Sequence, residues 1–286
     1  MTAVSRSLLR SYAKALAGPL IPGGGDELPD HDVTEEDVEI DRDHVAAYNR
    51  VCGFGVRDEL PPTYPHILGF PLQMSLMTER GFPFALLGMV HVGNRIEQRA
   101  AIPLTARPTL RVRAENLRPH RRGRQLDMVT EVELDGEVVW LEHSNYLKRG
   151  SGGDESAPPD PLADRIEPGT LEPSALWTVP GDIGRRYAEV SGDRNPIHRH
   201  PITAKLFGFP GAIAHGMWTL ARCLAAFEGR FPAAHTNEVA FQAPLRIPGK
   251  ARLADSSRDG GWDFSLERPD AERAHVVGTI APSSRT

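Results

Sequence analysis

Hydrophobic and polar positions follow two different periods along this chain. In HVAAYNRVCGF, residues 44–54, apolar side chains recur at helical spacing and the run ends at a glycine. IGRRYAEVSGD, residues 183–193, has the same pattern and the same glycine ending. In each half a proline-interrupted stretch follows, and then an apolar segment of helical length. These segments are LGFPLQMSLMTERG at 68–81 and HGMWTLARCLAAFEG at 215–229.

Runs with the two-residue alternation of β-strands come after the second helical segment of each half. The first half predicts strands in PTLRVRAENL, RQLDMVTEVEL and EVVWLEHSNYL, with a hairpin turn at residues 135–136. The second half predicts strands in EVAFQAPLRI, KARLADS, WDFSLE and AHVVGTIA, with turns at 259–261 and 269–270. Both halves thus give helix, irregular segment, helix and antiparallel meander. This matched order predicts an α+β chain built from a duplicated unit.

The stretch 149–180 interrupts this order. It is rich in Gly, Ser, Pro and Asp and lacks apolar periodicity, so we interpret it as a linker. The prediction is an N-terminal domain over 27–150, a linker over 151–175 and a C-terminal domain over 176–286. A chain of 286 residues is long enough for two domains of ordinary size.

Composition and charge exclude several classes of protein. A hydrophobic content of 40% and a charged content of 25% are typical of a soluble globular chain. The net charge of −5 argues against a nucleic-acid binder held by phosphate contacts. Two cysteines, Cys52 and Cys223, cannot form a disulfide framework, which favours a reducing, cytoplasmic setting. No apolar run approaches the roughly 20 residues of a membrane span.

The first 25 residues carry basic side chains and no acidic one. This composition resembles a transit peptide, and it also fits an exposed arm or a first helix. The strong preference for Arg over Lys, with abundant Ala, Gly and Pro, is typical of a GC-rich bacterial gene. We therefore expect an arm or helix rather than a targeting segment.

The stretch YAEVSGDRNPIH, residues 187–198, gathers ionisable and amide side chains at a bend. Gly192 is a natural helix C-cap, and the proline after Asn195 pushes that residue into extended geometry. The helix therefore ends here, and the bend can direct Asp193 and His198 toward one point. The alternative is an ordinary turn in which Asp193 and Asn195 cap the backbone.

A second chemical feature is HGM at residues 215–217. Gly216 stands at the start of a predicted helix, where unpaired N–H groups and the positive end of the dipole favour negative charge. Because glycine lets a ligand oxygen approach the backbone, this N–H could stabilise a carbonyl that gains charge. An acid and an imidazole near one water, with such a donor, suit water addition or loss at the carbon β to a thioester. A histidine pKa near 6.5 suits proton exchange at neutral pH.

Together the two stretches resemble the signature of the MaoC-like (R)-specific enoyl-CoA hydratases and (3R)-hydroxyacyl-thioester dehydratases. That signature is roughly Y-x-x-x-S-G-D-x-N-P-[LIV]-H with a downstream H-G-M. The matching positions are Tyr187, Ser191, Gly192, Asp193, Asn195, Pro196, Ile197, His198, His215, Gly216 and Met217. The resemblance implies a double hot-dog fold of the α+β class. In it, two antiparallel sheets, each wrapped on a central helix, pack as a pseudo-dimer in one chain.

The resemblance also implies an activity, namely reversible hydration of trans-2-enoyl thioesters to (3R)-3-hydroxyacyl thioesters, in fatty-acid metabolism. The acyl group would be carried by CoA or acyl carrier protein, with no cofactor or metal, and a homodimer is compatible with the family. The implied site consists of catalytic Asp193, His198, Asn195 and Gly216, and of substrate-binding His215, Met217 and Tyr187. Asp193 and His198 would activate one water, and the N–H of Gly216 would bind the thioester oxygen.

The first half departs from this pattern. Aligning YNRVCGF with YAEVSGD puts Phe54 opposite Asp193, and continuing without gaps puts Glu59 opposite His198. The acid is replaced by an apolar ring and the imidazole is lost. We therefore expect the N-terminal domain to be catalytically silent, to complete the sheet and to shape the acyl pocket.

Other interpretations stay open. His198, His200 and His215 could ligate zinc, although no cysteine or carboxylate spacing supports this. Ser191 with Asp193 and His198 could form a hydrolase triad, although the chain lacks G-x-S-x-G. Hot-dog folds also host thioesterases, because fold does not fix function. A non-catalytic acyl-thioester binding subunit would have no chemical need for Asp193 and His198 on one loop.

The strongest basic run is RPHRRGR, residues 118–124, in a predicted strand-to-strand turn. One interpretation is an exposed, solvated turn. The other is a docking site for CoA phosphates or for the acidic face of acyl carrier protein. The run has no interleaved aromatic residues, which argues against RNA binding.

Overall fold

The computed structural model describes residues 25–283 except 87, 151, 159–161 and 163. The basic stretch at the N-terminus, apart from its last residue, therefore lies outside the described residues. In the part that is described, no helix is both long and apolar enough to cross a membrane.

Each half of the chain provides the helices and strands of one unit. The first half contains β1 (Val33–Glu35), α2 (Arg42–Cys52), α3 (Tyr64–Met77), β2 (Met89–Gln98), β3 (Thr109–His120), β4 (Gly123–Leu134) and β5 (Glu137–Arg149). The second half contains β6 (Glu172–Val179), α4 (Ile183–Ser191), η1 (Pro196–His198), α5 (Pro201–Leu206), α6 (Gly216–Ala226), β7 (His235–Phe241), β8 (Gly249–Arg258), β9 (Gly261–Glu267) and β10 (Ala274–Pro282). The predicted α+β order of both halves is confirmed.

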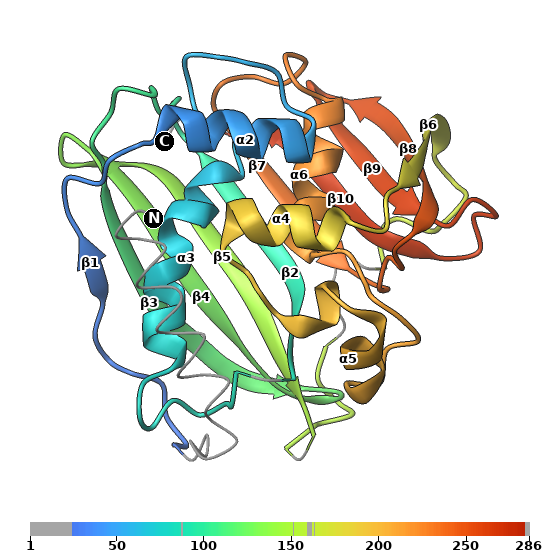
Figure 1. The fold of residues 1–286 in the computed structure, drawn as a ribbon, viewed down its shortest axis with the longest axis horizontal. Helices are drawn as coiled ribbons and strands as arrows, with labels where there is room; N and C mark the ends of the chain where they lie inside the picture. Colours follow the sequence, from blue (N-terminus) through green and yellow to red (C-terminus); the bar gives the residue numbers. More distant parts are fainter. Residues whose placement is uncertain (1–24, 87, 151, 159–161, 163, 284–286) are drawn as a thin grey trace.

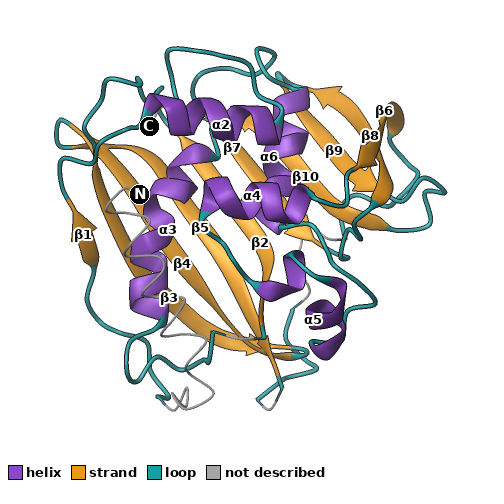
Figure 2. Ribbon diagram, viewed as in Figure 1, coloured by secondary structure: helices purple, strands orange, loops and turns teal. Residues whose placement is uncertain are grey.

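The described strands form one antiparallel sheet of ten, in the order β1-β3-β4-β5-β2-β7-β10-β9-β8-β6. Each half supplies five neighbouring strands, and β2 pairs with β7 from Gly93↔Ala240 to Gln98↔His235. The prediction of two sheets is wrong in this respect, because the edge strands of the two units join them into one sheet. The helices lie over one face of it (Figure 2), as a double hot-dog fold requires.

Several element boundaries differ from the predicted ones, and three of them have a clear local cause. α3 begins at Tyr64 rather than 68, because the proline at 65 stands in its first turn, where no N–H bond is needed. β7 ends at Phe241, since the next two amides both turn to the carbonyl of His275. β6 begins at Glu172, inside the segment interpreted as a linker, and pairs with β8. The domain boundaries themselves stay a prediction.

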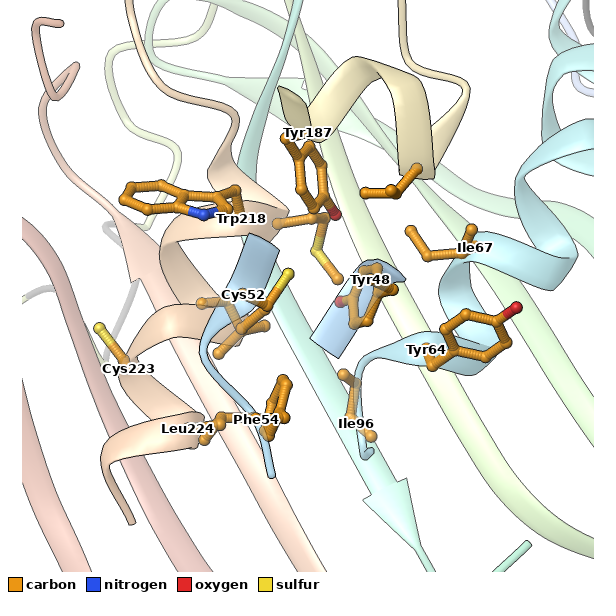
Figure 3. Packing of buried hydrophobic residues seen from close by; sticks show 14 of the residues in the cluster. Tyr48, Cys52, Phe54, Tyr64, Ile67, Ile96, Tyr187, Trp218, Cys223 and Leu224 are labelled. Atoms are coloured by element: carbon orange, nitrogen blue, oxygen red, sulfur yellow. The ribbon is translucent and has the colours of Figure 1, made fainter. Parts of the chain in front are cut away.

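The hydrophobic core is continuous between the two halves. Tyr48 of α2 and Tyr187 of α4 occupy matching positions before their glycine caps, and their ring centroids are 6.2 Å apart. The indole Nε1 of Trp218 in α6 donates to the carbonyl of Val51 in α2. Figure 3 shows these rings and Cys52 gathered between the helices and the sheet. The two units therefore pack as one body, with the pseudo-dimer arrangement that the fold predicts.

Candidate active site

Successive side-chain caps shape the loop that follows α4. Gly192 ends the helix with φ of 75°, the left-handed conformation predicted for a C-cap. The amide of Asp193 donates to Ser191 Oγ at 3.1 Å, and Asp193 Oδ1 accepts from the amide of Asn195 at 3.0 Å. Asn195 Oδ1 in turn accepts from the amide of Ile197 at 3.3 Å. The backbone-capping interpretation of Asp193 and Asn195 is confirmed, and it fixes where the loop points its other groups.

This loop brings Asp193 and His198 together with His215. Their potential ligand atoms all lie within 4.8 Å of one another. The rings of His198 and His215 are stacked, with centroids 3.7 Å apart. Asp193 Oδ2 lies 3.7 Å from His215 Nε2, and the Asp193 side chain is 28% exposed against 3% for His215. The carboxylate is therefore the more accessible group, and the imidazoles are buried behind it.

Hydrogen bonds to carbonyls fix the tautomers of the two histidines. His198 Nδ1 donates to the carbonyl of Ile213 at 2.9 Å, and His215 Nε2 donates to the carbonyl of Asp193 at 3.0 Å. Since a carbonyl oxygen only accepts, the neutral His198 must carry its proton on Nδ1. Its Nε2 is then a proton acceptor.

Burial keeps both imidazoles neutral near pH 7. It lowers the pKa of His198, an effect that the nearby Asp193 charge opposes. Burial lowers the pKa of His215 to about 3, and the neighbouring His198 lowers it further in the same direction. The site therefore combines one carboxylate with two uncharged rings.

Gly216 is the first residue of α6, so its N–H has no acceptor within that helix. A Cβ at this position would lie 3.3 Å from the ring of Phe241, closer than carbon atoms normally pack. Glycine therefore leaves room beside an N–H donor at the wall of the cavity.

A cavity of about 190 Å³ contains all seven predicted site residues in its lining. The second half contributes Tyr187, Asp193, Asn195, His198, His215, Gly216 and Met217. Residues of the first half that were not predicted complete the wall, among them His66, Phe70, His91, Tyr146 and Arg149. The cavity thus lies between the two units, and the first half shapes it.

The first half also holds a buried histidine–glutamate pair at this wall. His66 Nδ1 lies 2.8 Å from Glu142 Oε2, and Glu142 Oε1 accepts from Asn94 Nδ2 at 2.8 Å. Burial acts to raise the pKa of Glu142, but the neighbouring His66 and the hydrogen bonds from His66 and Asn94 lower it overall. A histidine in YPHILGF and a glutamate in EVVWLEHS, ionisable groups within apolar runs, were the sequence signal for this pair.

Two alternative assignments do not match the geometry. His200 is exposed and caps α5, its Nδ1 accepting from the amide of Ile202, so the three-histidine set is not assembled. Ser191 Oγ accepts the amide of Asp193, a capping role. Phe54, which aligns with Asp193, is buried and stacks on Tyr48 instead of lining the cavity.

Comparisons with known proteins show the family of this chain. The family model of the MaoC like domain matches residues 170–256, the stretch that carries the loop and the start of α6. The chain is 43% identical over 277 residues, 96% of each chain, to a protein of Mycobacterium tuberculosis named 3-hydroxyacyl-thioester dehydratase X.

Solved structures show the same architecture. A crystal structure of HtdX from Mycobacterium tuberculosis superposes with a TM-score of 0.78 at 40% identity, covering 88% of this chain and all of that one. Another Mycobacterium tuberculosis protein, described as having a double hot-dog fold, covers 91% of this chain and 98% of its own at a TM-score of 0.55 and 14% identity. The second comparison speaks for the fold alone. This chain has the double hot-dog fold and belongs to the MaoC-like dehydratase family, whose members are hydro-lyases.

Proposed function

We propose that this protein catalyses the reversible dehydration of (3R)-3-hydroxyacyl thioesters to trans-2-enoyl thioesters. The observation that carries the proposal is the clustering of Asp193 and His198 at one cavity wall, with Nδ1 of His198 engaged by a carbonyl so that its Nε2 is an acceptor. The name of the 43% identical relative, a 3-hydroxyacyl-thioester dehydratase, supports the substrate class. The (R) configuration rests on the family signature.

A water molecule has two protons to donate, and the site offers two acceptors. The Asp193 carboxylate accepts one, and Nε2 of His198 accepts the other because Nδ1 is committed to the carbonyl of Ile213. Such a water is oriented with its oxygen lone pairs toward the cavity. In hydration one of the two groups takes a proton from the water as its oxygen bonds to C3, and that proton is then delivered to C2, so that the site returns to its starting protonation state. Dehydration follows the same path in reverse.

The N–H of Gly216 binds the thioester oxygen in this proposal. As the C2–H bond forms or breaks, negative charge passes onto that oxygen, and a donor at the N-terminus of α6 stabilises it. Asn195 holds the loop through its cap to Ile197. His215 is a positioning residue, because it stacks on His198 and donates to the backbone of Asp193.

The test compares Asp193→Asn with the wild type, following 2-enoyl-CoA absorbance over substrates from four carbons upward, with chiral analysis of the product. We expect the variant to lose about 10²-fold or more in kcat, because the amide removes one acceptor of the water. Asp259→Asn is the matched control, since Asp259 lies in an exposed turn with φ of 37°, a conformation that Asn tolerates. Release of free thiol without enoyl turnover would instead identify a thioesterase.

A further inference from the structure

Exposed arginines gather where three strands of the first half end. Arg121 and Arg122 occupy the turn between β3 and β4, and Arg149 ends β5 directly opposite Gly123 in the sheet register. His120 beside them has a pKa lowered by burial and then by the charges of these arginines. Among the described residues, none of the three makes an ion pair, although Arg121 Nε donates to the carbonyl of Ala157.

Large apolar side chains are exposed on and beside the short helix α5. Ile202 is 65% exposed, Leu206 80% and Phe207 40%. The opposite side of this segment packs inward, where Ala204 contacts the buried cluster that Phe209 covers. Figure 1 shows α5 at the periphery of the molecule, away from the sheet. Solvent exposure of several such residues on one short segment is typical of an interaction surface.

The exposed arginines and the exposed apolar side chains of α5 both lie beside one cavity. Arg149 from the first group lines the cavity of the active site, and so does Phe209, which follows α5 in the chain. Arg199 and Lys205 add exposed positive charges on the α5 side. In a chain of net charge −5, this concentration of cations is a local exception. Asp154 and Glu155 are exposed acids that follow the β5 end, and the cations outnumber them.

We propose that this rim, formed by Arg121, Arg122, Arg149, Ile202, Leu206 and Phe207, docks an acidic, helical acyl carrier protein. The proposal rests on the proposed function and names the carrier of its substrate. The phosphates of CoA would satisfy the arginines but would leave the apolar side chains of α5 without a partner. An acidic helix with apolar residues complements both halves of the rim, and its phosphopantetheine arm would enter the cavity between them.

The experiment uses one acyl group on two carriers. Kinetics are measured with the same short 2-enoyl chain on CoA and on acyl carrier protein, for the wild type and for Leu206→Asp and Arg122→Glu. We expect KM for the carrier-protein substrate to rise about tenfold or more in each variant, while values for the CoA substrate stay within about twofold. Rising salt should weaken the carrier-protein reaction more than the CoA reaction.

Leu176→Asp is the matched control, since Leu176 is 63% exposed on the edge strand β6, which takes no part in the cavity lining. It should leave both substrates unchanged. Equal losses with both carriers, or no loss with either, would overturn the proposal. So would a wild type that turns over only the CoA substrate, or a wild-type dimer that Leu206→Asp dissociates, which would make the rim a subunit interface. A wild type inactive on both carriers would contradict the proposed function instead.

Discussion

The sequence revealed which residues gather at this site, but it did not reveal how they contact one another. The motif predicted that Asp193 and His198 would share a loop, because Gly192 and the proline after Asn195 end the helix there. It could not show that His215, 17 residues downstream of His198 along the sequence, stacks directly on it. That contact depends on how the start of α6 packs against the loop, which no local pattern records.

The buried histidines make stability depend on pH. In the unfolded chain His215 has its ordinary pKa of 6.5, whereas in the folded protein burial lowers it to about 3. On acidification the unfolded state therefore binds a proton before the folded state does. The stabilisation is present above pH 6.5 and is lost progressively as pH falls toward 3. We expect the free energy of unfolding to decrease steadily below pH 6.5.

The variant His215→Gln tests whether His215 causes this pH dependence of stability. Glutamine keeps an N–H donor for the carbonyl of Asp193 but does not titrate, so urea denaturation across this pH range should give a shallower pH slope. Activity at pH 7 should be higher in His215→Gln than in His215→Phe by about tenfold, the equivalent of one hydrogen bond. An unchanged slope would contradict the assignment, and equal activities would contradict the positioning role.

At the scale of elements, helix α4 and the segment that carries His198 are in direct contact through a glycine. Gly184 lies in the first turn of α4, and a Cβ there would overlap the carbonyl oxygen of His198. Alanine normally stabilises a helix relative to glycine by about 1 kcal/mol. Here it would push the loop that carries His198 away from α4, so we expect Gly184→Ala to lower both Tm and kcat, the latter by about tenfold or more.

The control for that substitution is Gly211→Ala, because a Cβ at Gly211 would only approach the side chain of Arg246, at 4.0 Å. Thermal melting and steady-state kinetics of both variants decide the matter. If Gly184→Ala melts higher than the wild type and keeps its kcat, helix propensity outweighs the contact with His198, and the loop does not depend on this packing.

Local sequence patterns located most elements and missed strands whose burial depends on their position in the sheet. β3 and β5 alternate clearly because one face of each covers the core, whereas β4 has a continuous buried run in its middle; all three were predicted nearly to their ends. β2 was not predicted, since this strand lies at the seam of the ten-stranded sheet and its burial does not alternate. β6 was taken for linker because it is an edge strand of largely exposed residues with a proline near its start.

At the scale of the molecule, the two units contribute different parts of one cavity. The second half supplies the loop and the helix N-terminus, and the first supplies Phe70, His91 and Tyr146 to the same cavity. Neither unit alone encloses the site. The two halves have the same order of helical segments, glycine ends and proline-interrupted stretches, and this order predicted two similar units. The joining of β2 to β7 is a long-range pairing that only the structure reveals.

This continuity predicts that the two halves unfold together. Ile96 is fully buried on β2 and Ile280 is 1% exposed on β10, and both belong to the same core cluster. Truncating either to alanine should cost about 2–5 kcal/mol. Because the seam and the core are shared, we expect each variant to weaken the slowest-exchanging amides of both halves by a similar free energy in native-state hydrogen exchange.

Comparing the two variants distinguishes a protein that unfolds as one cooperative unit from one whose halves unfold independently. If the units were independent, Ile96→Ala would speed exchange in β3, β4 and β5 and leave β8 and β9 as they are in the wild type, and Ile280→Ala would do the reverse. Calorimetry would then show two transitions. With a shared core a single transition moves to lower temperature in both variants, and the cavity between the halves is lost only when the whole protein unfolds. The active site would then have the stability of the entire sheet, although its reacting groups come from one loop.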